Sequence, residues 1–166
     1  MEIKELIENV KNIAKANFDL YTEGGLIAKS PWKIFDKACI ERIEYFESLS
    51  FVIPEDLKKF LLFSNGLECV SCEQRIHSIE SIIEVAEISK DTIRKGVYEI
   101  AYFMGDSIYI DSSLISTGNY LFYEGSGFDC GVLLECDFTT FLERLVLSNF
   151  SNYWRWVPEK KKAFHI

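Results

Sequence analysis

The chain has 166 residues and a formal net charge of −8 at pH 7, and 48% of its residues are hydrophobic. This length and composition predict one packed domain and exclude a disordered chain. The acidic balance argues against a nucleic-acid or anionic-membrane partner, and no apolar run approaches the ~20 residues that a membrane-spanning helix needs.

Two helices are predicted in the first 50 residues. Apolar residues at helical spacing predict an amphipathic helix over residues 2–17. An extended segment with a turn at Gly24-Gly25 follows. Ser30-Pro31 then has the residue types that begin a helix, a capping serine followed by proline. This second helix is expected to run to about Ser50.

A third helix over residues 54–66 has the clearest pattern in the chain. Pro54 suits the first position of a helix, where its missing N–H would have no partner. Apolar residues then recur at helical spacing, and Asn65-Gly66 is expected to end the helix because glycine tolerates a left-handed cap. The apolar face consists of Leu57, Phe60 and Leu61.

Beyond Gly66 the periodicity changes from helices to strands. Residues 67–78 contain short extended pieces, and residues 79–95 predict one or two short helices. Alternating residues and turn signals then predict successive antiparallel strands. These strands are residues 100–103, 108–111, 119–124 and 131–136.

Asp137 is expected to cap a closing helix. Its inner face would be Phe138, Phe141, Leu142, Leu145 and Val146. The order of elements predicts a single α+β domain, with N-terminal helices packed on a mostly antiparallel twisted sheet and a closing C-terminal helix.

Several motifs in this order resemble those of the SUKH superfamily, the Smi/Knr type. The run Ile53-Pro54-Glu55-Asp56-Leu57-Lys58-Lys59-Phe60-Leu61 with Asn65-Gly66 is similar to the family's hallmark helix. Ile108-Tyr109-Ile110-Asp111 looks like its core strand, and residues 137–142 (D-F-T-T-F-L) look like the start of its closing helix. The resemblance spans about residues 34–147. It leaves residues 1–33 as an N-terminal helix and connection and residues 152–166 as a tail.

The resemblance implies a binding protein that needs no cofactor, and not an enzyme. Members of the superfamily are best known as bacterial immunity proteins, which neutralise toxins that are often nucleases. Fungal relatives act as regulatory scaffolds, so a scaffolding domain without a toxin partner is the alternative function. A toxin gene directly upstream would favour immunity, and an isolated housekeeping context would favour scaffolding.

The cysteines carry the most distinct chemical motif, Cys69-x-x-Cys72. Cys130 and Cys136 can in principle complete a zinc site with this pair, but their spacing fits no common zinc knuckle. Buried or free thiols are therefore favoured over a metal. With Cys39 the cysteines form an odd, scattered set, which is typical of reduced thiols and of a cytoplasmic protein.

No catalytic motif emerges around the two histidines, His77 and His165. The stretch Gly125-Ser126-Gly127 lacks the strand-to-helix setting of a phosphate loop and is interpreted as a hairpin turn. The aromatic cluster at residues 153–156 (Y-W-R-W) can either anchor a partner or pack the C-terminal segment onto the domain.

The strands combine tyrosines with acids, which predicts a surface for a basic toxin. Carboxylates would speed association and aromatic anchors would slow dissociation. Charge reversal at Asp106 and Asp129 is expected to weaken binding without unfolding the domain. Burial of the tyrosines in the sheet, and acidity that serves solubility alone, remain open. The predicted partner-binding residues are Tyr102, Asp106, Tyr109, Asp111, Tyr120, Tyr123, Glu124, Phe128 and Asp129.

Overall fold

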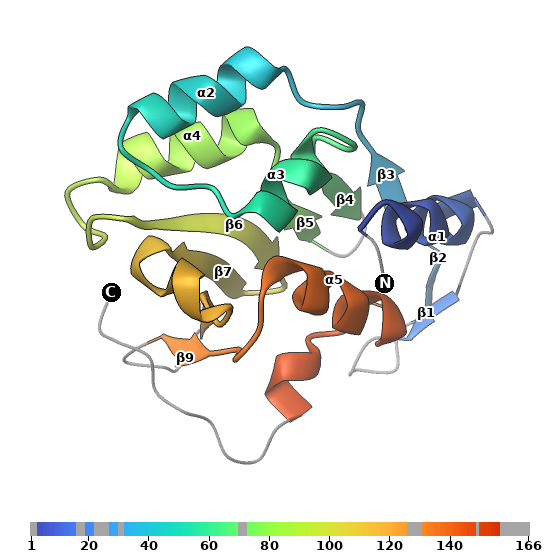
Figure 1. Ribbon diagram of the computed structural model, residues 1–166. Helices are drawn as coiled ribbons and strands as arrows, with labels where there is room; N and C mark the ends of the chain where they lie inside the picture. The colour runs from blue at the N-terminus through green and yellow to red at the C-terminus, as the bar shows by residue number, and fades with distance from the viewer. Residues whose placement is uncertain are drawn as a thin grey trace.

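Seven antiparallel strands form the central sheet of the computed structural model, and α-helices pack on it to complete a single α+β domain (Figure 1). The structure describes residues 3–15, 19–21, 27–29, 32–69, 73–125, 131–148 and 150–156. The sheet confirms the predicted fold class. Its order follows the chain, so each strand pairs with its neighbours in sequence: β3 (Trp32–Ile34), β4 (Leu67–Cys69), β5 (Gln74–Ile76), β6 (Val97–Phe103), β7 (Asp106–Asp111), β8 (Leu121–Gly125) and β9 (Val132–Leu133).

The helices form two groups. Helices α1 (Ile3–Lys15), α3 (Glu55–Leu61) and α5 (Phe138–Leu147) pack on one another, and α2 (Ile40–Ser48) packs on α4 (Ile79–Ser89), which contacts β6. Two short 3-10 helices, η1 (Ser112–Thr117) and η2 (Tyr153–Trp156), and a separate hairpin of β1 (Asp19–Tyr21) and β2 (Ile27–Lys29) complete the described elements.

The sheet has an inner face against the helices and an outer face on the opposite side. Because side chains alternate along a strand, paired residues on neighbouring strands share a face. Ile108 and Tyr123 are paired and belong to the main hydrophobic core. Tyr109 and Phe122 are also paired, and they form a second, smaller cluster with Val97 on the outer face.

The starts of α3 and α5 are joined by Asp56 and Tyr120. The Asp56 carboxylate accepts hydrogen bonds from the Tyr120 hydroxyl (2.5 Å) and from the Thr139 backbone N–H in the first turn of α5 (3.0 Å). The Tyr120 hydroxyl also accepts from the Phe138 N–H (2.9 Å), which would otherwise have no partner in the helix. Asp137 caps α5 as predicted.

Asn65-Gly66 has a different role from the predicted one. Helix α3 ends at Leu61, before this pair, so the prediction of a C-terminal cap is wrong. The Asn65 side chain instead accepts from the Ile79 N–H (2.8 Å) and donates to Glu80 (2.8 Å). It therefore supports the start of α4, whose N-cap is Ser78. Gly66 has φ +99° and lies against the backbone of the β5–α4 connection.

The prediction of one helix from Ser30 to Ser50 is wrong in its first half. Trp32–Ile34 forms strand β3, and residues 35–39 have no regular secondary structure before α2 begins at Ile40. Trp32 pairs with Cys69 across the strands, and the Ala38 N–H donates to the Leu61 carbonyl (2.8 Å). These partners are distant in the chain, so they override the local helix signal.

The hydrophobic core includes residues outside 34–147, the range that the family resemblance covers. Helix α1 contributes Leu6, Ile7 and Val10, and the C-terminal segment contributes Phe150 and Trp154. The predicted helix over 2–17 is confirmed as α1. The four predicted strands are confirmed with other bounds: β6 and β7 begin earlier than predicted, β8 is shifted, and β9 is shorter. The 3-10 helix η1 was not predicted. The turn at Gly24-Gly25 lies outside the described residues.

Candidate protein-binding surface

The nine residues predicted to bind a partner do not form one exposed face. Tyr102 and Glu124 are half-buried, and their strands place both on the outer face, where each pairs with Ser107. Phe128 and Asp129 lie outside the described residues. The expectation of exposure is wrong for the remaining members, which are buried: Asp106, Tyr109, Asp111, Tyr120 and Tyr123.

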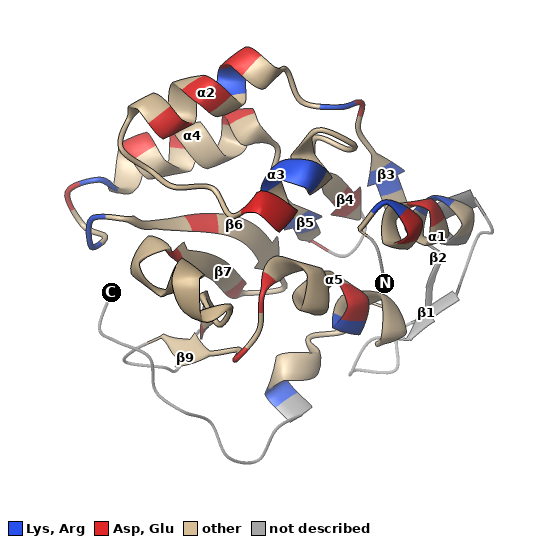
Figure 2. Cartoon of the chain, in the orientation of Figure 1, with Lys and Arg blue, Asp and Glu red and all other residues tan. Residues whose placement is uncertain are grey.

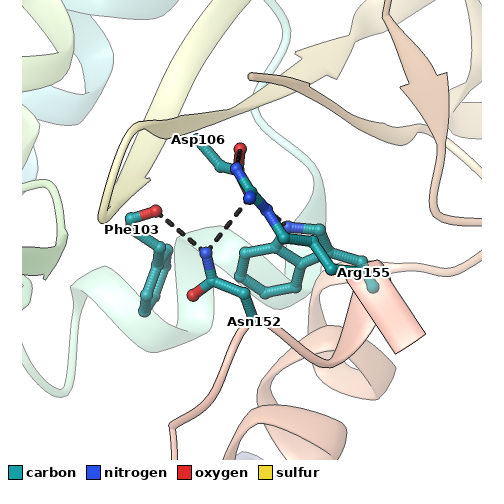
Figure 3. Close-up of polar contacts among 5 residues, drawn as sticks. Phe103, Asp106, Asn152 and Arg155 are labelled. Atoms are coloured by element: carbon teal, nitrogen blue, oxygen red, sulfur yellow. Dashed lines mark hydrogen bonds and ion pairs between the residues drawn. The ribbon is translucent and has the colours of Figure 1, made fainter. Parts of the chain in front are cut away.

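Asp106 is a structural anchor for the C-terminal segment (Figure 3). Its carboxylate has no exposed surface and accepts hydrogen bonds from the Trp154 indole (2.8 Å) and from Nε (2.7 Å) and Nη2 (2.6 Å) of Arg155. Asn152 donates both to this carboxylate (3.2 Å) and to the Phe103 carbonyl (3.1 Å). The network therefore fastens η2 to the β6–β7 hairpin, and Trp154 packs onto the domain.

Asp111 also has a structural role. It accepts from the Arg94 guanidinium and from the Ser113 N–H (3.0 Å) and hydroxyl (2.6 Å), and it caps η1. A buried carboxylate needs such partners because water no longer solvates it. The prediction that Asp106 and Asp111 bind a partner is therefore wrong for one physical reason. The charge of each carboxylate is satisfied by hydrogen bonds within the fold and is not available to a partner.

His77 is paired with Glu99, a contact that the sequence did not predict. Its Nε2 lies 2.9 Å from Oε1 of Glu99, and both side chains are largely buried. The pair joins the end of β5 to β6. Within the described ranges, no three His, Cys, Asp or Glu side chains are placed to hold a metal ion.

Cys136 is expected to resist alkylation in the folded protein. Burial raises the pKa of its thiol to about 12, so at pH 8 only about one molecule in ten thousand carries the reactive thiolate. The exposed Cys39 provides the internal control. Iodoacetamide labelling followed by peptide mass spectrometry should modify Cys39 first and Cys136 only in urea. Equal labelling of the two in native protein would contradict this burial.

An exposed acidic and apolar surface lies instead on α2 and α4. Figure 2 shows acidic residues along both helices. The Tyr45 hydroxyl donates to Glu87 across the two helices (3.3 Å), and the Arg42 guanidinium lies over the Tyr45 ring, 5.2 Å from its centroid. We call this the α2–α4 surface and define it by its exposed residues Ile40, Glu41, Arg42, Glu44, Tyr45, Glu84, Glu87 and Ile88, among which the acids outnumber the one base.

The chemistry of the α2–α4 surface suits contact with a protein. Ile88 is 76% exposed and Tyr45 is 40% exposed, although large apolar side chains of this kind usually face a core. Tyrosine is common at interfaces because it combines apolar area with a hydroxyl. The sequence signal was present as glutamates at i, i+3 and i+4, but nothing in the sequence showed that the two helices are neighbours.

The fold places this protein in the class of α+β domains with an open antiparallel sheet. No family model matches the chain. It is similar to two proteins of Bacillus subtilis (strain 168). "Uncharacterized protein YobM" is 28% identical over 134 residues, covering 73% of this chain and 72% of that protein. "Uncharacterized protein YnaB" is 28% identical over 123 residues, covering 72% and 83%. Neither name states an activity. In the described part of the chain, no helix is long and apolar enough to cross a membrane.

Proposed function

We propose that this chain is a SUKH-type immunity protein, which binds a basic protein toxin, such as a nuclease, and neutralises it by covering the active site. The observation that carries the proposal is the α2–α4 surface, where exposed Tyr45 and Ile88 stand among glutamates. A binding protein needs such apolar anchors within a complementary electric field. The proposed function is binding alone and involves no catalysis.

The geometry of the motifs supports the resemblance on which the family assignment rests. The proline-led motif and the closing motif are about 80 residues apart in sequence, yet they touch through Asp56 and Thr139 (3.0 Å). Phe60 and Phe138, one from each motif, have ring centroids 5.1 Å apart. These two motifs therefore form one structural unit, and the roles of these contacts lie in folding.

The mechanism follows from the charge of the surface. Exposed glutamates on two neighbouring helices attract a basic partner and raise the rate of productive encounters. Once the partner is docked, burial of the Tyr45 ring and the Ile88 side chain removes apolar area from water and slows dissociation. Inhibition then requires only that the bound domain cover the toxin's active site.

Replacing Glu84 and Glu87 together with lysine is expected to slow association with the toxin about tenfold at low salt. Both side chains are exposed, so the fold should remain intact. The rate constant can be measured by stopped-flow fluorescence or surface plasmon resonance. Since the reversal removes the attraction, the salt dependence of the association rate should also become weaker.

The matched control is the pair Glu5→Lys and Glu55→Lys, which changes net charge equally on exposed positions of α1 and α3. If this control slowed association as much as the α2–α4 variant, net charge rather than this surface would steer binding. Growth rescue on co-expression with the protein encoded next to this gene tests the function itself. No rescue, with co-purification of a cellular protein instead, would favour the scaffolding alternative.

A further inference from the structure

A pocket that is separate from the α2–α4 surface lies at the edge of the sheet beside β3. It has a volume of about 790 Å³ and is formed by α1, β3, the segment that follows β3 and the end of α3. Aromatic and aliphatic side chains form most of its wall, including Trp32, Phe35 and Phe63, and Leu62 beside them is 38% exposed.

Lysines surround this pocket, although the protein as a whole is acidic. The Lys11 ammonium lies 4.3 Å from the centroid of the Phe63 ring, and the Lys33 ammonium lies 4.6 Å from that of Phe35. Lys37 also lines the pocket, and Figure 2 shows the basic residues on α1 and β3. The acids nearby include Asp36 in the wall, Glu8, which lies 3.6 Å from Lys11, and Glu68, which pairs with Lys33 across β3 and β4.

Trp32 lines the same pocket. Its side chain is 5% exposed and stacks on Phe150 with ring centroids 4.0 Å apart. The indole N–H is buried and has no hydrogen-bond partner among the described residues. Because Trp32 lines the pocket, the resonance of this N–H reports on what binds there.

The last strand of the sheet, β3, also lies here. Of the described strands, β3 pairs with β4 alone and ends the order of the sheet. Edge strands can pair with an added extended chain, whose backbone supplies affinity while alternate side chains enter pockets. The pocket lies directly beside this edge, because β3 residues form part of its wall.

We propose that this edge pocket binds an extended, acidic peptide segment of a protein partner. Each feature of such a segment matches one feature of the pocket. Its apolar side chains fill the aromatic wall, its carboxylates pair with Lys11 and Lys37, and its backbone pairs with the edge of β3. This contact is separate from the proposed toxin contact, since the pocket is basic and the α2–α4 surface is acidic.

The probe is a synthetic nonapeptide in which aspartate or glutamate alternates with isoleucine or phenylalanine. A control peptide carries lysine in place of each acid. In ¹⁵N-labelled full-length protein, the acidic peptide should shift the indole N–H resonance of Trp32, assigned with Trp32→Phe, in a saturable titration. The lysine peptide should leave that resonance unchanged.

Lys11→Glu with Lys37→Glu should weaken acidic-peptide binding about tenfold. The matched control, Lys90→Glu with Lys95→Glu, changes two exposed lysines far along the chain by the same charge. Thermal unfolding of both variants checks that they fold. Absence of saturable binding to wild type, equal binding of both peptides, or an unaffected Lys11/Lys37 variant would overturn the proposal. So would a dimer that the same variant dissociates, because a second copy would then occupy the edge.

Discussion

Replacing Asp106 with alanine is expected to lower the free energy of unfolding by about 3 kcal/mol, because its carboxylate is a buried acceptor for three side chains. The substitution leaves the Trp154 indole and the Asn152 amide without this partner. Arg155 is partly exposed and regains water, so the loss should fall at the lower end of the range for a broken buried ion pair. Urea unfolding followed by circular dichroism measures the change.

The control for Asp106 is Asp91→Ala, which removes an exposed aspartate after α4 and should change stability by less than about 0.5 kcal/mol. A double-mutant cycle with Arg155→Ala isolates the pair, and a coupling energy near zero would show that the two residues act independently. A loss for Asp106→Ala as small as that for Asp91→Ala would contradict the anchoring role of this carboxylate.

Gly66→Ala should have a comparably large effect, with a loss of about 3 kcal/mol or more. The residue has φ +99°, which strains any other amino acid. In addition, a Cβ atom would lie 2.7 Å from the Ile76 carbonyl oxygen and 3.0 Å from the Ser78 nitrogen. These are backbone atoms, so the clash can be relieved only by moving β5 or the start of α4.

Gly118→Ala is the matched control for Gly66. Gly118 also has a positive φ, +73°, but a Cβ atom there would meet nothing within 4 Å. Its substitution should therefore cost only the conformational strain, about 1 kcal/mol. Chemical denaturation of the two variants separates strain from collision. Equal losses at both glycines would mean that the contact between Gly66 and the β5–α4 connection is not tight.

Local patterns were sufficient to predict the elements that depend on local chemistry. Helix α5 combines a capping Asp137 with apolar residues at helical spacing, and the structure confirms both. The strand β7 forms as predicted, but its burial does not alternate, because Tyr109 and Asp111 on the outer face are buried as well. Asn65-Gly66 shows where local reasoning stops: the pair was recognised, but its partners are the backbones at Ile79 and Ile76, which only the folded chain brings near.

The candidate site could not be predicted from the sequence, because its residues come together only in the folded chain. Asp106 looks like a surface acid in the sequence, because its main partner Arg155 follows 49 residues later. Tyr120 and Tyr123 are buried by helices that pack from other parts of the chain. The α2–α4 surface likewise exists only because two helices, 30 residues apart in sequence, lie side by side.

The most direct test of the proposed function is a titration of toxin activity. A candidate toxin, chosen because co-expression of this protein rescues growth, is purified, and its activity is measured at a concentration well above the dissociation constant while increasing amounts of this protein are added. A stoichiometric inhibitor that covers the active site predicts a linear fall to zero at a fixed molar ratio. Undiminished activity at a saturating excess, with a complex still formed, would contradict neutralisation by occlusion.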